Sequence, residues 1–330
     1  MKAIEIHDPV LGSINITEPL LLDLLDTKTV KRLINIHQSG ATYLVREGRG
    51  GNRYEHSVGV MLLIRLLGGS VEEQAAGLLH DISHTAFSHV IDQVFLNNKE
   101  TFHEENKTWF TEYSDVPKVL SKYGLEVNYI FNEHNWSILE QPQPDLCADR
   151  VDYTLRDLYN LGIISKKEID SFLNNLAIIN DKIVVKNIDV AVWFAKQYYF
   201  EVINLFMSPI EIFANNHLAL AIRTAIDKGV LTLEDMLLKD DYQIIELIKN
   251  SHNHEIKKIF NDLNFKIKVK NDDKDFDYQG FSKPRIVDPL VLKDDGSIVR
   301  CSEVVPMIKS LHEEVREKAS KGIFVKKDIS

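Results

Sequence analysis

The sequence predicts a mainly α-helical fold with small β-hairpin additions at the N-terminus and in the C-terminal third. Most of the chain up to about residue 228 divides into helical segments with recognisable start and stop residues. Alternating apolar and polar residues occur only in short stretches beside turn residues. Because 330 residues are many for one compact core, we expect a large helical domain over 1–228, with its core at about 27–160, and a smaller α+β region over 229–330.

The first half of the chain begins with a short hairpin and continues as helices. Residues 4–6 and 13–16 alternate around a turn at Pro9 and Gly12, which predicts two paired strands. The predicted helices cover 19–25, 27–37, 53 to about 67, 71 to about 80, 87–95, 103–113 and 145–161. Asp26 is the expected N-cap of the second helix, a capping box at Ser70 to Glu73 starts the fourth, and Gly162 is the expected C-cap of the last. A glycine-rich loop is expected at 48–52.

The second half mixes helices with short strands. An Asn180-Asp181 turn between apolar runs predicts a hairpin at 178–185. Pro209 separates two predicted helices, at about 188–206 and 210–228, because proline cannot continue a helix. Short helices to about 260, strands near 286–292 and 298–300 with a turn at 294–296, and a charged helix over 304–320 complete the expected order.

Composition narrows the class of protein. The net charge of −10 argues against a broad nucleic-acid surface, which needs a basic face, although a local pocket can still bind a small anion. Two cysteines, Cys147 and Cys301, exclude a disulfide framework and suit a reducing compartment. The polar N-terminus does not read as a signal peptide, and the longest apolar run, 58–67, is too short to span a bilayer. We therefore expect a soluble, cytoplasmic protein without a membrane partner.

The most informative feature is the adjacent pair His80-Asp81 at the end of an apolar helical run. Alone, this pair would more readily be a helix end with an aspartate cap. Here His56 precedes it and Asp149 follows it, each within its own predicted helix. Two imidazoles and two carboxylates form a mixed nitrogen and oxygen ligand set for a divalent metal ion, with coordination positions left for water and substrate.

Further polar residues surround this set. On the helix that contains Asp149, the residues at 149, 152, 153, 156 and 157 fall on one arc, which predicts a pocket wall. His84, His89 and His103 crowd the segment after the pair, and Asp92 neighbours His89 on a helix. Metal, histidines and arginines are the parts that phosphoryl transfer needs: a charge clamp, an activated water and a proton donor.

These motifs resemble the HD-domain phosphohydrolase superfamily and, within it, the deoxynucleoside triphosphate triphosphohydrolase branch, including the HD domain of its sterile-alpha-motif members. The resemblance covers about residues 5–160 and continues more weakly to about 228. It rests on motifs in order along the chain: Ile6 to Gly12, Asp26-Thr27, Ile36 to Gln38, Arg53 to Ser57, Leu79 to His84, Phe87 to His89 and Phe102 to Glu105.

The resemblance implies roles for individual residues. His56, His80, Asp81 and Asp149 would ligate a divalent ion (Mn, Mg, Fe, Zn or Ni), and His103, paired with Asp92, would handle the proton. Arg53, His84, His89 and Arg150 would contact phosphates, whereas Tyr153, Asp157 and Gln38 would face the sugar. His103 could instead be only a helix-terminal residue beside Glu104 and Glu105.

The chain also departs from the branch. Relatives carry a Tyr-x-His element that meets sugar and phosphate, where this chain has Phe206 and Ser208. Their nucleotide-activator site uses an acid, matched by Asp26, and an arginine, here replaced by Ile34. We expect hydrolysis of a nucleotide phosphoester, foremost a deoxynucleoside triphosphate to nucleoside and triphosphate. Another phosphoester substrate, or a nucleotide-binding regulator without turnover, stays open, as do the base and a homo-oligomeric state.

Overall fold

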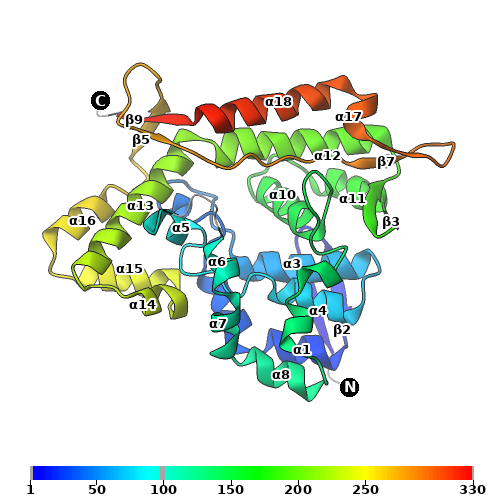
Figure 1. Ribbon diagram of the computed structural model, residues 1–330, viewed down its shortest axis with the longest axis horizontal. Helices are drawn as coiled ribbons and strands as arrows, with labels where there is room; N and C mark the ends of the chain where they lie inside the picture. Colours follow the sequence, from blue (N-terminus) through cyan, green and yellow to red (C-terminus); the bar gives the residue numbers. More distant parts are fainter. Residues whose placement is uncertain (1–2, 97–100, 329–330) are drawn as a thin grey trace.

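The computed structural model describes residues 3–96 and 101–328, which form a mainly helical body with small sheets (Figure 1). This confirms the predicted fold class. In the described residues no single helix is both long and apolar enough to cross a membrane, although one bent pair, Ile188–Phe206 with Pro209–Asp227, meets that criterion by length and composition.

The first part of the chain folds as a hairpin followed by packed helices. The two predicted strands pair antiparallel, with Ile4 opposite Ile16 and Asp8 opposite Gly12. The elements are β1 (Ile4–Asp8), β2 (Gly12–Ile16), α1 (Pro19–Leu25), α2 (Lys28–Arg32), α3 (Arg53–Leu66), α4 (Val71–Leu79), α5 (Val90–Val94), α6 (Phe102–Glu105), α7 (Lys107–Glu112), α8 (Val116–Lys122), α9 (Val127–Ile130) and α10 (Ala148–Asn160).

Two predicted helices begin or end elsewhere. The helix expected over 27–37 is only α2 followed by a 3₁₀ turn, Leu33–Asn35, and its N-cap is Thr27, whose hydroxyl accepts from the Val30 amide. Asp26 instead caps the C-terminus of α1 and pairs with Lys31. The helix expected over 87–95 starts only at Val90, because Phe87 and Ser88 have φ angles of 60° and 57°.

Other boundaries differ for local reasons. The segment expected as one helix over 103–113 is two, α6 and α7, with a break at Asn106. Helices α8 and α9 were not predicted. The capping box expected at Ser70 is half formed: Ser70 accepts from the Glu73 amide, but the Glu73 carboxylate accepts the Ile138 and Leu139 amides of the loop before α10.

Helices α3, α4 and α10 pack together and carry the candidate ligands. Gly59 permits the close approach of α10 to α3, because a Cβ atom there would lie 2.0 Å from Arg156 Nη2 and 2.1 Å from Asp152 Oδ1. Gly77 similarly lets α4 approach Ile64 of α3. The core between these helices is apolar, with Val60, Met61 and Leu78 fully buried. The rigid packing fixes where the ends of these helices point.

The second part adds long helices and two small sheets. Its elements are α11 (Lys166–Asn174), β3 (Leu176–Ile179), β4 (Lys182–Val185), α12 (Ile188–Glu201), a π-helical turn (Val202–Phe206), α13 (Pro209–Asp227), α14 (Leu233–Leu238), α15 (Asp241–Asn250), α16 (His254–Asn261), β5 (Lys268–Asn271), β6 (Tyr278–Gly280), β7 (Leu290–Leu292), β8 (Ile298–Arg300), α17 (Cys301–Val304), α18 (Pro306–Lys321) and β9 (Ile323–Asp328). The Asn180-Asp181 hairpin turn and the break at Pro209 are as predicted.

The C-terminal residues return to the body of the protein. Helix α18 runs beside α12 along one edge of the molecule (Figure 1). Strands β3, β4, β7 and β8 form one sheet, in which β7 pairs in parallel with β4. A second sheet, β5-β9-β6, was not predicted. The domain boundary expected near residue 228 stays a prediction, although strands from both sides of it share the first sheet.

Candidate metal centre and its pocket

The four candidate ligands come together from three helices. His56 lies in α3, His80 and Asp81 follow the last residue of α4, and Asp149 lies in the first turn of α10. His56 Nε2 is 3.0 Å from Asp149 Oδ1, and His80 Nε2 is 3.6 Å from the same oxygen. The Asp81 oxygens lie 3.7 Å from His56 Nε2 and 3.5 Å from His80 Nε2.

The hydrogen bonds behind both histidines suit metal ligation. His80 Nδ1 lies 2.7 Å from the Gly77 carbonyl, which can only accept, so Nδ1 carries the proton. His80 Nε2 is buried and has no hydrogen-bond partner among the described residues. His56 Nδ1 donates to Asp152 at 2.9 Å in the same way. Both Nε2 atoms therefore face the two carboxylates, and such second contacts typically orient metal-binding histidines. The residues fit a divalent ion.

The imidazoles and carboxylates of this cluster shift one another's pKa values. Burial opposes a charged imidazole, yet hydrogen bonds to Asp149 and Asp152 raise the pKa of His56 to about 10. Burial likewise opposes ionisation of Asp149, but His56 and His80 hold the pKa of that carboxyl well below its usual range. Buried carboxylates held ionised beside inward-facing imidazoles attract a positive charge, whether a proton or a metal ion.

A buried ion-pair chain supports His56 from behind. Asp152 accepts from Arg156 at 2.7 Å, and Arg156 pairs at 2.9 Å with Asp8 at the end of β1. Asp152 and Arg156 are almost completely buried, so they do not face the pocket. The prediction that the whole polar arc of α10 forms a pocket wall is therefore wrong for these two. The Asp8 contact was missed, although Asp8 belongs to the Ile6 to Gly12 motif.

Arg53 joins the centre to its surroundings. It is buried and pairs with Asp81, and its Nε donates to Ser88 Oγ at 2.7 Å. The Ser88 hydroxyl donates in turn to the His37 carbonyl at 2.7 Å. The positive charge of Arg53, opposing the burial of Asp81, keeps the pKa of that carboxyl well below its usual range.

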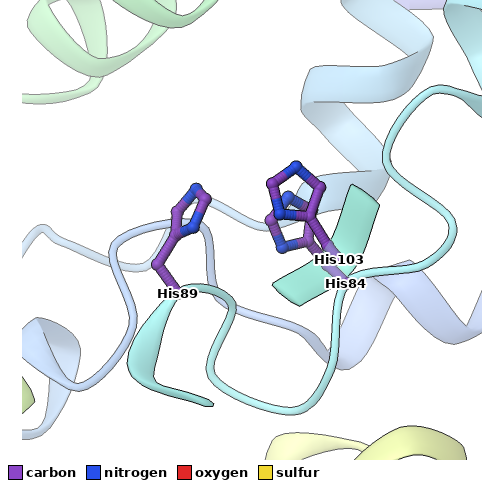
Figure 2. A group of neighbouring side chains, drawn as sticks. All are labelled: His84, His89 and His103. Atoms are coloured by element: carbon purple, nitrogen blue, oxygen red, sulfur yellow. The ribbon is translucent and has the colours of Figure 1, made fainter. Parts of the chain in front are cut away.

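Three histidines form a second group beside the centre. Figure 2 shows His84 and His103 with overlapping rings and His89 facing them. The His84 and His103 rings are stacked at 4.0 Å and 16°, and His89 lies edge-on to both. His84 Nε2 reaches Asp81 Oδ1 at 3.2 Å, which links the two groups. Burial, reinforced by the charge of His89, lowers the pKa of His103 to about 2.

The expected pairing of His103 with Asp92 is not formed. Asp92 is buried, lies 3.3 Å from His89 Nδ1, and accepts the Phe102 amide. His103 Nδ1 is buried and has no partner in the described part of the chain. Asp92 thus contacts the neighbouring histidine, three residues away on the same turn, and holds the start of α6.

The three-histidine group is poorly arranged for a metal ion of its own, although its ring nitrogens lie within 4.8 Å of one another. The lone pair of an imidazole nitrogen lies in the ring plane. Two rings stacked nearly parallel at 4.0 Å cannot both direct their lone pairs at one ion about 2.1 Å away. The same rings can present N–H groups side by side to a larger anion.

Both groups open into one cavity of about 830 Å³, within the usual size range of ligand pockets. Gln38, Arg150, Tyr153 and Asp157, which the sequence predicts to contact substrate, all line it. Arg150 is held by the Glu140 carboxylate at 2.7 Å. The Tyr153 hydroxyl is 3.1 Å from that of Tyr198 on α12, a lining residue that the sequence did not reveal.

The two residues that stand where relatives carry the Tyr-x-His element have different positions relative to the cavity. Phe206 lines the cavity with its ring 6.1 Å from that of Tyr153. Ser208 does not line it; its hydroxyl accepts the Glu211 amide as the N-cap of α13. Residues of the segment before β7 also reach the cavity, among them Lys283 and Arg285. Nothing in their local sequence indicated this.

Comparison with known proteins agrees with this geometry. The family model described as "HD domain" matches residues 53–157. The chain is 40% identical over 323 residues, 98% of both chains, to the uncharacterized protein YdhJ of Bacillus subtilis. It is 37% identical over 176 residues, 53% of this chain and 51% of the other, to the metal-dependent phosphohydrolase cns2 of Cordyceps militaris.

Two further similarities are more distant. The deoxynucleoside triphosphate triphosphohydrolase SAMHD1 of Danio rerio is 27% identical over 219 residues, 51% of this chain and 35% of the other. The crystal structure of a hypothetical protein from Aquifex aeolicus matches the fold with a TM-score of 0.70 at 20% identity, covering 96% of this chain and 99% of that one.

Proposed function

The chain belongs to the HD-domain superfamily of metal-dependent phosphohydrolases, and we propose that it cleaves a deoxynucleoside triphosphate to a deoxynucleoside and triphosphate. One observation carries the proposal: the ligand set His56, His80, Asp81 and Asp149 shares a nucleotide-sized cavity with a wall of three histidines. A bound divalent ion would polarise a phosphoryl oxygen and the attacking water.

The histidine wall supports binding of a phosphate chain. Imidazole N–H groups and the Arg53 guanidinium converge beside the ligand set, where phosphate oxygens would meet them. In the structure His84 and His103 are held neutral by burial, since the pKa of each lies well below its usual value. A neighbouring phosphate favours the charged form of an imidazole, so substrate binding itself would equip His103 with a proton.

The chemistry then needs two proton transfers: the attacking water loses a proton to the solvent, and the departing sugar oxygen gains one. Attack of water on the α-phosphorus forms a new P–O bond and breaks the bond to the sugar 5′ oxygen. That oxygen leaves as an alkoxide unless it receives a proton, and His103 is our candidate donor because it lies on the cavity wall with an unbonded Nδ1. Asp92 would act through His89, which it contacts, rather than through His103.

The other end of the cavity suits a nucleoside. Tyr153, Tyr198 and Phe206 give aromatic surface, and Gln38 and Asp157 give polar groups beside it. The Gln38 side-chain oxygen is buried without a hydrogen-bond partner in the described residues, so it is available to a ligand donor such as a sugar hydroxyl. We therefore assign the sugar and base to this end.

A substrate screen tests the proposal. The purified protein is stripped of metal, reloaded separately with Mn²⁺, Mg²⁺, Fe²⁺, Zn²⁺ or Ni²⁺, and offered deoxynucleoside and ribonucleoside triphosphates and simple phosphomonoesters and diesters. We expect the deoxynucleoside triphosphates to be consumed fastest, with triphosphate released. Consumption of a simple phosphoester alone would favour a phosphatase or phosphodiesterase. Tight nucleotide binding without turnover under every metal would favour a regulator.

A further inference from the structure

The glycine-rich loop at 48–52 places a buried arginine beside the cavity. The residues on either side of Arg49 lie at the surface, whereas its side chain is only 3% exposed. Two hydrogen bonds hold the loop: the Gln38 amide donates to the Gly51 carbonyl at 3.0 Å, and the Ser39 hydroxyl donates to the Arg49 carbonyl at 3.3 Å. The loop therefore directs one guanidinium into the interior of the protein.

The Arg49 guanidinium lies between two carboxylates from different helices. Its Nη1 is 3.5 Å from Asp157 Oδ2 on α10, and its Nη2 is 3.5 Å from Glu211 Oε2 in the first turn of α13. Both carboxylates line the main cavity, and Asp157 belongs to the end that we assign to the nucleoside. Arg49 itself lines only a small adjoining recess. It therefore acts on the cavity through Asp157 and Glu211.

The interior around Arg49 contains more acidic groups than it can neutralise. A third carboxyl, Glu201 at the end of α12, is fully buried, and neither of its oxygens has a hydrogen-bond partner among the described residues. Burial raises the pKa of Asp157 and of Glu211, and it raises that of Glu201 well above its usual value. Arg49 opposes this rise at Asp157 and Glu211 more than any other group does, so we expect Glu201 to hold the proton.

The groups at this end of the cavity suit a hydroxyl and not a phosphate. Asp157 and Glu211 offer carboxylate oxygens, and the buried Gln38 side-chain oxygen beside Asp157 has no partner in the described part of the chain. All of these oxygens accept hydrogen bonds, and carboxylates repel the negative charge of a phosphate. A deoxynucleoside triphosphate has one free sugar hydroxyl, at the 3′ position, which can donate to them.

We propose that Arg49 is a positioning residue for sugar recognition: it holds Asp157 and Glu211 side by side, and the paired carboxylates bind the 3′-hydroxyl of the substrate. The inference rests on the proposed nucleotide function for its ligand. It adds Arg49 and Glu211 to that function, and both lie outside the matched family segment, 53–157. Because the claim concerns binding of a hydroxyl, it can be tested without turnover.

The test is calorimetric binding of the four 2′-deoxynucleosides to the metal-loaded protein, each compared with its 2′,3′-dideoxy counterpart. We expect the wild type to bind the best deoxynucleoside about tenfold or more tightly than its counterpart, because only the former donates to a charged acceptor. In Arg49→Gln this preference should largely disappear, through weaker binding of the deoxynucleoside alone. Arg316→Gln removes an equal charge from the exposed face of α18 and is the matched control, which should keep the preference.

Two further variants separate positioning from loss of the fold. Arg49→Lys keeps the positive charge but offers one nitrogen in place of the planar fork, so it should retain part of the preference. If Arg49→Gln loses its cooperative thermal unfolding, Glu211→Gln is measured in its place. Glu211→Gln keeps the shape of the side chain and should lower the preference in the same way.

The outcomes distinguish this role from the proposed reaction. A wild type without the preference, an unchanged preference in the variant, or an equal loss of affinity for both nucleosides overturns the inference. Inorganic tripolyphosphate has no sugar and should bind the variant like the wild type; a parallel loss there also overturns it. A lost preference in a protein that hydrolyses no deoxynucleoside triphosphate would uphold the role of Arg49 and refute the proposed function. Hydrolysis with the preference unchanged in the variant would do the reverse.

Discussion

At the scale of single residues, the candidate centre is defined by which nitrogen of each histidine holds the proton. The Gly77 carbonyl and the Asp152 carboxylate accept hydrogen bonds from the Nδ1–H groups of His80 and His56, so both Nε2 atoms turn toward Asp81 and Asp149. The motif His80-Asp81 indicated the candidate ligands from sequence alone. Their supporting contacts could not be read there, because they join residues as distant as His56 and Asp152.

The first prediction concerns Asp81. Asp81→Asn should lose bound metal and hydrolysis together, because the amide keeps the shape and one oxygen but not the negative charge that attracts a divalent ion. Asn is preferable to Ala, since Ala would also leave buried Arg53 without a partner. Metal content is measured by elemental analysis alongside turnover. Full metal content in an active Asp81→Asn protein would remove Asp81 from the ligand set.

The second prediction concerns His103. His103→Ala should lower kcat by roughly 10²–10⁴-fold while metal content stays at the wild-type level, because a general acid acts mainly in the transition state. Steady-state kinetics and elemental analysis on the same preparation check both parts. Normal turnover would show that His103 is not the proton donor, and the candidate would then be His84 or His89, the other two histidines of the group.

At the scale of elements, the turn that carries the histidines is held by a helix far away in sequence. Asp241, at the start of α15, is fully buried. One of its oxygens accepts the Phe87 amide at 2.6 Å, and the other lies 3.0 Å from the His37 amide and 2.8 Å from His37 Nδ1. Arg32 adds a second tie by donating to the His84 carbonyl and to the Lys239 carbonyl.

The third prediction tests this tie. Asp241→Asn places an NH₂ group where one acceptor oxygen stood, so at least one buried hydrogen bond is lost, at a cost of about 1–3 kcal/mol. We expect a lower Tm and a lower kcat, because the Phe87–Ser88 turn positions both Ser88 beside Arg53 and the histidines around it. Exposed Asp294→Asn is the control. A variant with wild-type Tm and kcat would show that the Phe87–Ser88 turn keeps its conformation without the hydrogen bonds to Asp241.

The hydrogen bonds of Asp241 also show which elements could be predicted from the sequence and which could not. Periodicity and capping residues predicted α3, α4 and α10, on which the ligands lie. They failed at residues 87–89, where helical spacing is present but contacts with Asp241 favour a positive-φ turn. Local signals cannot report a hydrogen bond to a residue about 150 positions away, and the part of the cavity lining that comes from the segment before β7 was missed for the same reason.

At the scale of the whole molecule, we expect this chain to differ from its relatives in regulation by a nucleotide activator. The fourth prediction is activity that needs no added GTP or dGTP. Ile34, where an arginine would be required, is 47% exposed and offers no hydrogen-bond donor, and Asp26 already pairs with Lys31. Turnover is compared with and without each nucleotide at fixed metal. Strong stimulation would reveal a different activator site.

The central claim is that the chain directs water to the α-phosphorus of a deoxynucleoside triphosphate, and the products formed in ¹⁸O-labelled water test it most directly. The best substrate of the screen is incubated with the metal-loaded enzyme, and the products are identified by mass. We predict unlabelled deoxynucleoside and triphosphate carrying one ¹⁸O, with neither formed by Asp81→Asn. Release of a nucleoside monophosphate or diphosphate, label in the nucleoside, or the same products from Asp81→Asn would contradict the account.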